Sequence, residues 1–458
     1  MTLVEKLSVI WKEDNLLRRV VKHSSYLFSS NVLSSVLSFI QTIIATRLIG
    51  LENWGLVFAI QTFANNINRF LSFRMSEVVL KHLGQALAED KKQEAAVVVK
   101  AAGLAEAVTS ILAFLILLLL TPWASRTFAR NVNFAPLFAF YGLILLSNLI
   151  FETSTGVLQA SHRFDHLAKA NLIQSIITVT VIGGTYVTFR WISPAIGPYL
   201  LQAILLAYVL GKTYYAAALA IAASRELNLQ LEPGWWRIPL RTLPNKRSFF
   251  AFAINTNLNG TVNLVFRDNI PLYLASLVSL TDVGLFKIAL TLLLPLTMIL
   301  DPFIGPTFAE ISRTIAKFQW DTTLRLLRRI TVIATGVVLA FWAGWAALGW
   351  WLIPLLYKQQ ALPAYLVLLI LIPGYGFAGI FQWNRSLFLS VGKPGYPLLI
   401  SVLVGIIELA VMVVLVPHYG NAMMAAILSG YFIVSIGLIS LRGVWAIRRQ
   451  RPKAVSPA

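Results

Sequence analysis

The sequence predicts an all-α integral membrane protein with about twelve transmembrane helices, arranged as two six-helix lobes around a central cationic cavity. Three observations lead to this fold class: the hydropathy of the chain, the division of its basic residues between loops, and a repeat at half its length. Apolar residues make up 57% of the 458 residues and charged residues only 12%, whereas soluble domains contain roughly 25% charged residues. With a mean hydropathy of +0.73, most of the chain must face lipid.

The apolar residues are grouped into stretches long enough to cross a bilayer. A spanning helix needs about 20 mostly apolar residues, because the hydrocarbon core is about 30 Å thick. We expect spans near 24–46, 55–78, 97–120, 134–158, 168–190, 198–222, 248–274, 282–308, 328–353, 362–390, 396–416 and 422–445.

The basic residues of the loops fall mainly on one side of these spans. With the N-terminus inside, the inner loops and the termini carry 27 Lys and Arg residues, and the outer loops carry five. Lys and Arg are retained on the cytoplasmic side of membranes, so both termini are expected in the cytoplasm. Residues 1–23 then form a cytoplasmic amphipathic arm and 446–458 a basic cytoplasmic tail. The expected location is the cytoplasmic (inner) membrane.

The second half of the sequence repeats features of the first half. Gly55 has a counterpart 229 residues later, at Gly284, and Arg163 has one at Lys393. The amphipathic stretches 83–100 and 312–329 are also 229 residues apart. An even number of helices per repeat gives both repeats the same topology. We expect an N-terminal lobe over 24–223, a cytoplasmic linker over 224–247 and a C-terminal lobe over 248–445.

The composition excludes several classes of function. The chain has no cysteine, which excludes disulfides, thiol catalysis and cysteine-ligated metals. Its five histidines form no HExxH pair and it has no Walker motif, so we expect no enzyme activity, metal, cofactor or ATP hydrolysis. A net charge of +19 would suggest nucleic acid in a soluble protein. Here it indicates cytoplasmic loops and an anionic substrate, with no nucleic acid.

Six basic residues remain inside the predicted spans. A charge at the bilayer centre costs at least about 2.5 kcal/mol, so such residues line a watery cavity, pair with a partner, or extend to an interface. For Arg74 and Lys212 these alternatives stay open, and we expect the other four to line the cavity. With Arg47, from an outside loop, the candidate substrate-binding cations are Arg47, Arg69, Arg74, Arg267, Lys287 and Arg385.

Polar stripes in the second and seventh spans support this assignment. Arg69 follows Asn65 and Asn68, and Arg267 follows Asn255, Asn259 and Asn263, at helical spacing. Amides bind sugar hydroxyls, and guanidinium groups bind phosphate through paired hydrogen bonds. A third stripe in the first span, with Ser34, Ser38, Gln41 and Thr42, either lines a cavity or binds helices together.

Three acidic residues are candidates for ion coupling. Glu152 and Glu408 lie in otherwise apolar spans, and Asp268 follows Arg267 directly. A carboxylate in a span can carry a coupling proton or bind sodium. For Asp268 an ion pair with a nearby arginine is the alternative. Coupling to H+ or Na+ is therefore an open expectation.

Several runs resemble a known family. The run from Arg47 to Leu56 resembles the junction of helices one and two in polysaccharide transporters. The run from Arg267 to Leu274, followed by 283–289, and the run Gly392-Lys393-Pro394 resemble later segments of the same family. These transporters belong to the MOP superfamily. They are similar to O-antigen (Wzx-type) flippases and, more distantly, to lipid II flippases and MATE exporters.

The resemblance implies a flippase. It would move an undecaprenyl-pyrophosphate-linked oligosaccharide, an O-antigen or other surface polysaccharide unit, from the inner to the outer leaflet by alternating access. The implied partners are this glycan, membrane lipids and other glycan-assembly proteins, and the chain would act as a monomer. A MATE-like multidrug or cation antiporter is the main alternative, for which acidic cavity residues should outnumber basic ones. A membrane enzyme of glycan assembly is the third, which would need a long outside loop or a DxD-type site.

The charge split gives a direct prediction of topology. Reporter fusions at residue 235 and at the C-terminus should be active only as cytoplasmic reporters, because both segments are rich in Lys and Arg. Periplasmic activity at either position would contradict the predicted orientation.

Overall fold

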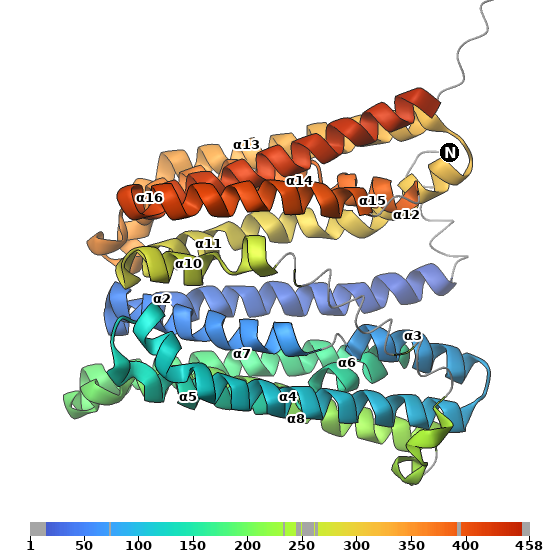
Figure 1. The fold of residues 1–458 in the computed structure, drawn as a ribbon, viewed down its shortest axis with the longest axis horizontal. Coiled ribbons are helices and arrows are strands. Elements are labelled where there is room, and N and C mark those ends of the chain that lie inside the picture. The colour runs from blue at the N-terminus through green and yellow to red at the C-terminus, as the bar shows by residue number, and fades with distance from the viewer. Residues whose placement is uncertain are drawn as a thin grey trace, which may run out of the picture. The chain divides into compact units, whose positions relative to one another are not determined.

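The computed structural model describes residues 15–72, 75–231, 234–243, 249, 261, 264–391 and 395–450, and these residues form helices and turns without any strand (Figure 1). The helices of the N-terminal half are α2 (Asn15–Leu71), α3 (Met75–Ala88), α4 (Lys92–Phe128), α5 (Ala135–Gly142), α6 (Phe151–Ala160), α7 (Phe164–Val187) and α8 (Leu200–Leu231). Those of the C-terminal half are α10 (Ile270–Leu277), α11 (Leu280–Leu300), α12 (Ile304–Ala316), α13 (Trp320–Tyr357), α14 (Ala364–Ile380), α15 (Trp383–Ser390) and α16 (Gly395–Gln450).

The chain divides into two units by its internal contacts. Unit 1 comprises Met1–Leu48 and Ile60–Thr261, and unit 2 comprises Ile49–Ala59 and Val262–Ala458. The helix α2 therefore contributes a short segment, Ile49–Ala59, to the unit that contains the C-terminal half.

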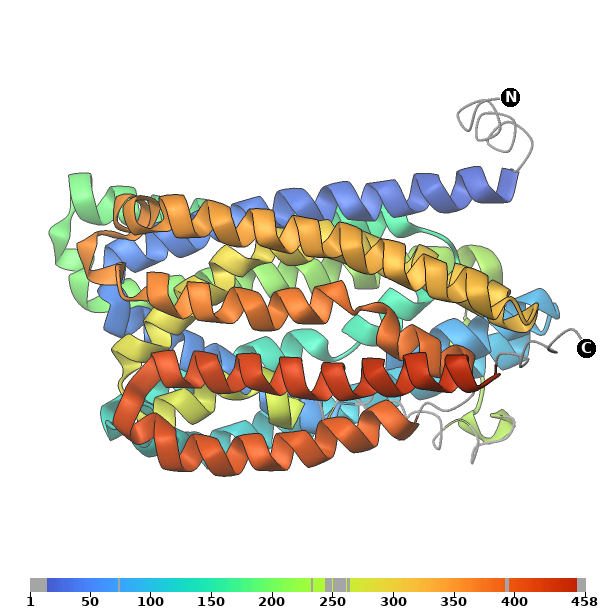
Figure 2. The ribbon, with the colours of Figure 1, turned by 90° about the horizontal axis from the view of Figure 1, so that it is seen from above.

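The helices confirm an all-α membrane protein. Nine helical segments in the described part are long and apolar enough to cross a membrane. Two of them bend sharply, α2 at Gly50 and α16 at Gly420, where φ is positive. The apolar part of α16, Gly395–Arg448, has 54 residues and would be about 80 Å long if it were straight. Each bend therefore separates two arms that are each long enough to cross the membrane. Figure 2 shows the two arms of α16 running in opposite directions. Most of the predicted span 248–274 lies outside the described residues, so the count of twelve stays a prediction.

Four predicted spans are interrupted in the structure. The span 134–158 consists of α5, the 3-10 turn η2 (Leu143–Asn148) and α6. The span 362–390 breaks at Phe381 and Gln382, and 282–308 contains a 3-10 turn, η8 (Asp301–Phe303). The span 55–78 was wrong at its end, because α2 stops at Leu71 and α3 begins at Met75. Hydropathy reports the composition of a segment and not its hydrogen-bond register, so it does not reveal these breaks.

The backbone confirms the internal repeat. The turn between α3 and α4 has Asp90 at φ 54°, and the turn between α12 and α13 has Phe318 at φ 55°. After α4 and after α13 come Arg130 at φ 51° and Lys358 at φ 72°. Non-glycine residues rarely adopt positive φ, and each pair is separated by 228 residues. The two halves therefore share their turn geometry as well as their helix order.

The two glycines that mark the repeat in the sequence pack against each other in unit 2. A Cβ added to Gly55 would lie 1.8 Å from the carbonyl oxygen of Leu280, and one added to Gly284 would lie 2.3 Å from that of Leu51. Small residues allow helix backbones to approach this closely in membranes. The pair therefore sets the distance between α11 and the segment Ile49–Ala59.

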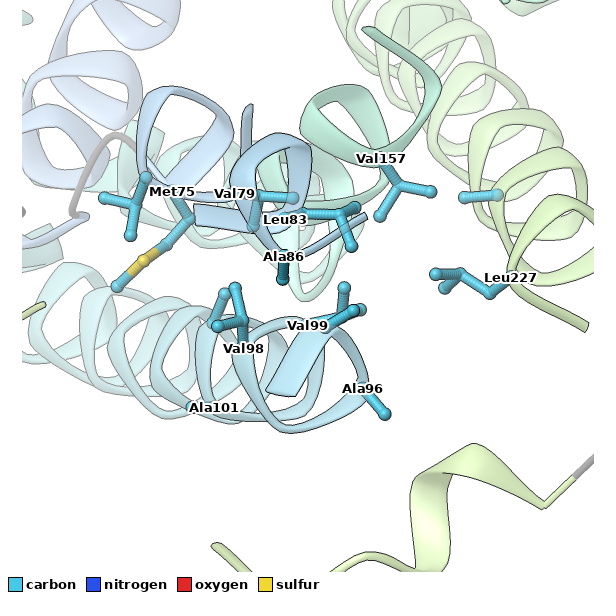
Figure 3. Packing of buried hydrophobic residues seen from close by; sticks show 14 of the residues in the cluster. Met75, Val79, Leu83, Ala86, Ala96, Val98, Val99, Ala101, Val157 and Leu227 are labelled. Carbon is cyan, nitrogen blue, oxygen red and sulfur yellow. The ribbon is translucent and has the colours of Figure 1, made fainter. Parts of the chain in front are cut away.

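A core rich in Ala, Val and Leu holds α3, α4, α6 and α8 together in unit 1 (Figure 3). Leu83 of α3, Val98 of α4 and Val157 of α6 are among its buried members. At Gly156 of α6 an added Cβ would lie 2.8 Å from the carbonyl oxygen of Ser76. This close approach brings the first turn of α3 next to α6.

The polar stripe of the first span binds helices together. The Gln41 amide donates to the carbonyl of Ser175 at 3.1 Å, and Ser30 Oγ donates to that of Ala168 at 2.6 Å. The Asn171 amide contacts Ser34 Oγ at 3.2 Å. Both Ser34 and Gln41 are buried, so this stripe joins α2 to α7.

The glycine contact gives a test of the packing. Gly55→Ala should destabilise the protein by about 1–3 kcal/mol, because overpacking forces the backbones apart. The matched control is Gly344→Ala in α13, where an added Cβ meets nothing within 4 Å and alanine should be neutral or slightly stabilising. The measurement is the melting temperature of the detergent-solubilised protein. Equal melting temperatures for the two variants would contradict this packing.

Candidate functional site: an arginine-lined cavity

Unit 2 contains a cavity of about 750 Å³, a size typical of ligand sites. Its wall brings together two of the predicted candidates, Arg267 and Arg385, which are 118 positions apart in the sequence. The remaining lining residues come from α11, η8, α12, α14, α15, α16 and the break between α14 and α15, and are Leu296, Thr297, Leu300, Asp301, Ile304, Phe308, Tyr375, Ala378, Gly379, Gln382, Asn384, Ser386 and Phe432.

Arg267 is held at the end of a short π-helical turn, η7 (Leu264–Asp268), just before α10. Its Nε donates to Oδ1 of Asp268 at 2.9 Å. The Tyr273 hydroxyl donates to the carbonyl of Val265 at 3.1 Å and ties this turn to α10. The sequence left two roles open for Asp268, ion coupling and an ion pair with a nearby arginine. The structure shows the ion pair with Arg267.

Arg385 is positioned by the packing of α15. Trp383 and Leu387, one turn apart, are 3% and 1% exposed and belong to a hydrophobic cluster with α12, α13 and α16. Trp383 Nε1 also donates to Thr331 Oγ1 at 3.0 Å. Residue 385 lies about 200° around the helix from 383, so burial of that face turns Arg385 toward the cavity, where its side chain is exposed.

The rest of the wall combines polar groups with aromatic rings. Asn384 and Ser386 flank Arg385, and Asp301 contributes an exposed carboxylate. Tyr375 and Phe432 form an aromatic pair with ring centroids 4.9 Å apart. Apart from Arg385, none of these residues was among the site residues predicted from the sequence. The polar run Asn384-Arg385-Ser386 inside an apolar span was a usable signal, whereas nothing in the sequence marks the aromatic pair.

The other predicted substrate-binding residues, both cations and asparagines, lie elsewhere or are not described. Lys287 of α11 places its Nζ 4.3 Å from the ring centroid of Phe58, in a cation–π contact within unit 2. Four candidates lie on α2, namely Arg47, Asn65, Asn68 and Arg69. Four others fall outside the described residues, namely Arg74, Asn255, Asn259 and Asn263. Their part in a substrate site stays a prediction.

The two remaining acidic candidates are in different environments. Glu408 of α16 is 4% exposed, and neither of its carboxylate oxygens has a hydrogen-bond partner in the described part of the chain. Glu152, in the first turn of α6, accepts a hydrogen bond from Ser76 Oγ. Neither residue lines the arginine cavity.

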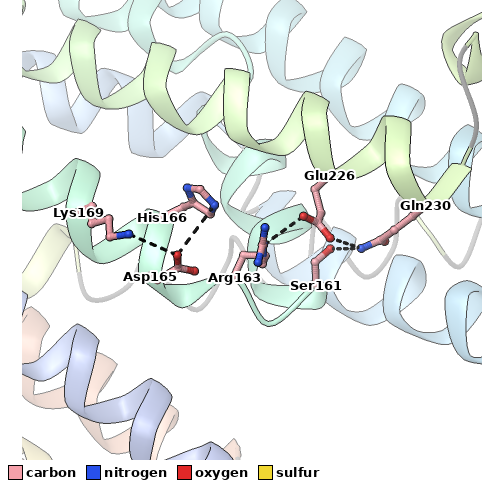
Figure 4. Close-up of polar contacts among 7 residues, drawn as sticks. All are labelled: Ser161, Arg163, Asp165, His166, Lys169, Glu226 and Gln230. Carbon is pink, nitrogen blue, oxygen red and sulfur yellow. Dashed lines mark hydrogen bonds and ion pairs between the residues drawn. The ribbon is translucent and has the colours of Figure 1, made fainter.

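Two separate groups of polar contacts lie at the loop between α6 and α7 in unit 1, and one of them joins this loop to α8 (Figure 4). Arg163 Nε contacts Glu226 Oε2 at 3.1 Å, and Gln230 donates to Ser161 Oγ at 3.0 Å. Asp165 lies 3.8 Å from Lys169 Nζ and 4.0 Å from His166 Nε2. Arg163, which the repeat matches with Lys393, therefore contacts α8 through Glu226.

Comparison with known proteins agrees with this description. The family model described as "Polysaccharide biosynthesis protein" matches residues 20–312. A curated relative is the inner membrane protein YghQ of Escherichia coli (strain K12), which is 27% identical over 158 residues. That match covers 34% of this chain and 44% of YghQ, so the chain spans under half the length of this relative.

The fold is similar to solved transporter structures. The lipid II flippase MurJ in an inward closed conformation superposes with a TM-score of 0.67 at 13% identity, over 92% of this chain and 87% of MurJ. A multidrug resistance MATE family transporter of the MOP superfamily, inward-facing, gives 0.66 at 11% identity over 91% and 94% of the two chains. A MOP superfamily transporter from Pyrococcus furiosus gives 0.60 at 13% identity, over 95% and 96%. At these identities the likeness establishes the fold, and the function has to be argued from the site.

Proposed function

This chain belongs to the polysaccharide biosynthesis protein family, and from that premise we propose that it is a flippase for a lipid-linked oligosaccharide. The proposed substrate is an undecaprenyl-pyrophosphate-linked repeat unit of a surface polysaccharide. It moves from the inner to the outer leaflet of the cytoplasmic membrane by alternating access, and both termini of the chain are cytoplasmic.

The arginine-lined cavity is the observation that supports this proposal most. Arg267 and Arg385 reach it from separate helices, and a guanidinium group binds a phosphate through two parallel hydrogen bonds. Arg385 makes no hydrogen bond or ion pair with another residue in the described part of the chain, so its donors are available to a ligand. Amide, hydroxyl and aromatic groups around them suit the sugar that follows the pyrophosphate.

The proposal also addresses the energetic obstacle to moving this substrate. A pyrophosphate carries about two negative charges, and even one charge at the bilayer centre is costly. Fixed cations and dipoles in a cavity replace the water that the pyrophosphate loses, while the polyprenyl tail stays in lipid. Transport of this kind is driven by an ion gradient or by the substrate gradient, with no ATP site.

A MATE-like cation exporter is the second candidate, because MATE structures share the fold. A cation site should carry a net negative charge. The cavity wall instead holds two arginines and one carboxylate, Asp301, and the neighbouring Asp268 is paired with Arg267. The lining residues themselves therefore carry a net positive charge, two arginines against Asp301, which favours an anionic substrate, while Asp268 neutralises part of the charge of Arg267.

Substitution of Arg385 tests the proposed site. A hydrogen bond to a charged group contributes about 1.5–3 kcal/mol, so Arg385→Ala should weaken substrate binding by about one to two orders of magnitude. Arg267→Ala should have a similar effect. Arg385→Lys should restore only part of the loss, because the ammonium keeps the charge but loses the two-pronged geometry.

The measurement is glycan export in a flippase-null strain complemented with each variant, with protein levels compared. Arg328→Ala is the matched control, since Arg328 is an exposed arginine on α13 outside the cavity. Normal export by Arg267→Ala and Arg385→Ala, together with loss of export in Arg328→Ala, would show that the site is misplaced.

A further inference from the structure

Unit 2 has a second hollow, at the turn between α12 and α13, which shares no lining residue with the arginine cavity. Its volume is about 420 Å³, and we call it the turn groove. It is lined by Ile315, Phe318, Trp320, Ser390 and Val391. We propose that the turn groove binds a short amphipathic helix of a partner protein, in the place that the end of α8 takes in unit 1. This inference does not depend on the function proposed above.

Phe318 distinguishes the groove from an ordinary turn. It has a φ of 55°, and its side chain is 77% exposed. A bulky residue at positive φ is an outlier, and an exposed apolar ring is unfavourable in water. The corresponding turn of unit 1 has Asp90 at φ 54°, a residue type that tolerates both this backbone and water. The turn itself therefore does not require a phenyl ring. Its centroid lies 6.2 Å from that of Trp320, so two aromatic rings border the groove.

The internal repeat identifies what lies at the corresponding place in unit 1. In α8 the ammonium of Lys212 lies 5.6 Å from the ring centroid of Tyr215, and in α16 the guanidinium of Arg442 lies 4.0 Å from that of Trp445. The two pairs are 230 positions apart. On this alignment the described end of α16 corresponds to position 220, whereas α8 continues through 221–231. This last part of α8 has no counterpart in the described part of unit 2.

In unit 1 the end of α8 covers the core with an apolar face. Ala223, Leu227 and Leu231 follow one another at helical spacing and are at most 6% exposed. They belong to the core with α3, α4 and α6, and Figure 3 shows Leu227 directed toward Val157 of α6. In the part of the chain that the structure describes, the corresponding core of unit 2 has no member from α16 beyond Ile447. The turn groove is therefore the uncovered counterpart of this contact.

A polar contact fastens the same end of α8 in unit 1. The Gln230 amide donates to Ser161 Oγ at 3.0 Å (Figure 4). Ser390 is the counterpart of Ser161, 229 positions later, and it lines the turn groove. Its Oγ donates to the carbonyl of Ser386 at 2.9 Å and contacts Ser312 Oγ at 2.8 Å. One lone pair of this oxygen is left to accept a hydrogen bond from a docked helix.

The sequence that follows α16 does not encode such a helix. Residues 451–458 read Arg-Pro-Lys-Ala-Val-Ser-Pro-Ala, with Val455 as the single large apolar residue. Proline in a helix interior removes a hydrogen bond and clashes with the preceding turn, and this segment contains Pro452 and Pro457. The occupant we propose is therefore a segment of another protein.

The charge around the groove indicates an acidic partner. Residues 310–329 carry five Lys and Arg and two acidic residues, whereas the corresponding residues 81–100 carry four and three. Lys317 and Arg325 are exposed, and Lys317 makes no hydrogen bond or ion pair in the described part of the chain. Complementary charge directs association toward one kind of partner. We therefore expect a helix with Asp or Glu beside apolar residues that recur every four positions.

The position of the groove along α13 favours a protein over a lipid. The first large apolar residue of α13 that is exposed is Val332, at 63%. It lies about 18 Å further along the helix than Trp320, at about 1.5 Å per residue. The headgroup layer outside the hydrocarbon core is only about 5–8 Å thick. With Val332 facing lipid, the turn groove lies beyond the headgroups, on the side predicted to be cytoplasmic.

A peptide that copies the end of α8 tests the proposal. The probe has the sequence of residues 219–231 with Glu in place of Arg225, and carries a fluorophore. Its binding to the full-length protein in lipid nanodiscs is measured by fluorescence anisotropy, with empty nanodiscs as background. We expect saturable binding that Phe318→Asp weakens at least about tenfold, although aspartate suits this backbone. The same peptide with Lys in place of Arg225 should bind several-fold more weakly.

The matched control is Leu229→Asp, because Leu229 is 79% exposed on α8 in unit 1 and so resembles Phe318 in exposure. It should leave the affinity for the acidic peptide unchanged. Binding that does not exceed that of empty nanodiscs, or equal binding by wild type and Phe318→Asp, would overturn the proposal. Equal affinity for the acidic and basic peptides would overturn the acidic character of the partner.

Crosslinking in cells identifies the natural occupant. The photoreactive residue p-benzoylphenylalanine replaces Phe318 or, as the control, Leu229, and the crosslinked peptides are sequenced by mass spectrometry. From position 318 alone we expect crosslinks to one protein, through a segment with acidic residues beside apolar residues at helical spacing. Crosslinks to lipid, to residues 451–458 or to a second copy of this chain in place of such a segment would overturn the proposal, as would the same products from both positions.

Discussion

A helix that breaks inside a membrane must have its free backbone groups satisfied by protein, because lipid offers no hydrogen bonds. This constraint acts at the same place in both repeats, where an apolar span is divided into α5, η2 and α6 in one half and into α14 and α15 in the other. In the first half Glu106 satisfies it by capping α6. In the second half the segment after the break packs through Trp383 and Leu387 and leaves Arg385 in the cavity.

The two breaks differ in what surrounds them. Around α6 the groups are close-packed and nearly neutralise one another, with the carboxylates of Glu106 and Glu152, the ammonium of Lys212 and the positive end of a helix. Around α15 they are open, and Arg385, Arg267 and the carboxylate of Asp301 line the same cavity. Under our proposed function, the break in the second half presents Arg385 to the pyrophosphate.

The sequence predicted the features that depend on local composition or on periodicity. These features are the long apolar stretches and the repeat marked by Gly55 and Gly284. Arg267 and Arg385 were selected because a charge in lipid is costly, and both line one cavity of unit 2. Their role in binding a substrate stays a prediction. The break at η2 could not be predicted, since 143–150 reads Leu-Ile-Leu-Leu-Ser-Asn-Leu-Ile, without proline or glycine. The role of Glu106 was also missed, because its partner Thr153 lies 47 residues away, and the aromatic pair Tyr375 and Phe432 depends on tertiary packing.

The central claim is that this chain moves a lipid-linked pyrophosphate between leaflets, and reconstitution tests it most directly. Vesicles containing the purified chain and a fluorescent undecaprenyl-pyrophosphate-linked sugar would be treated with a membrane-impermeant quencher. If the claim is correct, quenching without ATP should exceed the outer-leaflet share of the label. Vesicles that contain the Arg385→Ala variant should reach the same final extent of quenching much more slowly. Quenching limited to the outer-leaflet share, as in protein-free vesicles, would contradict it.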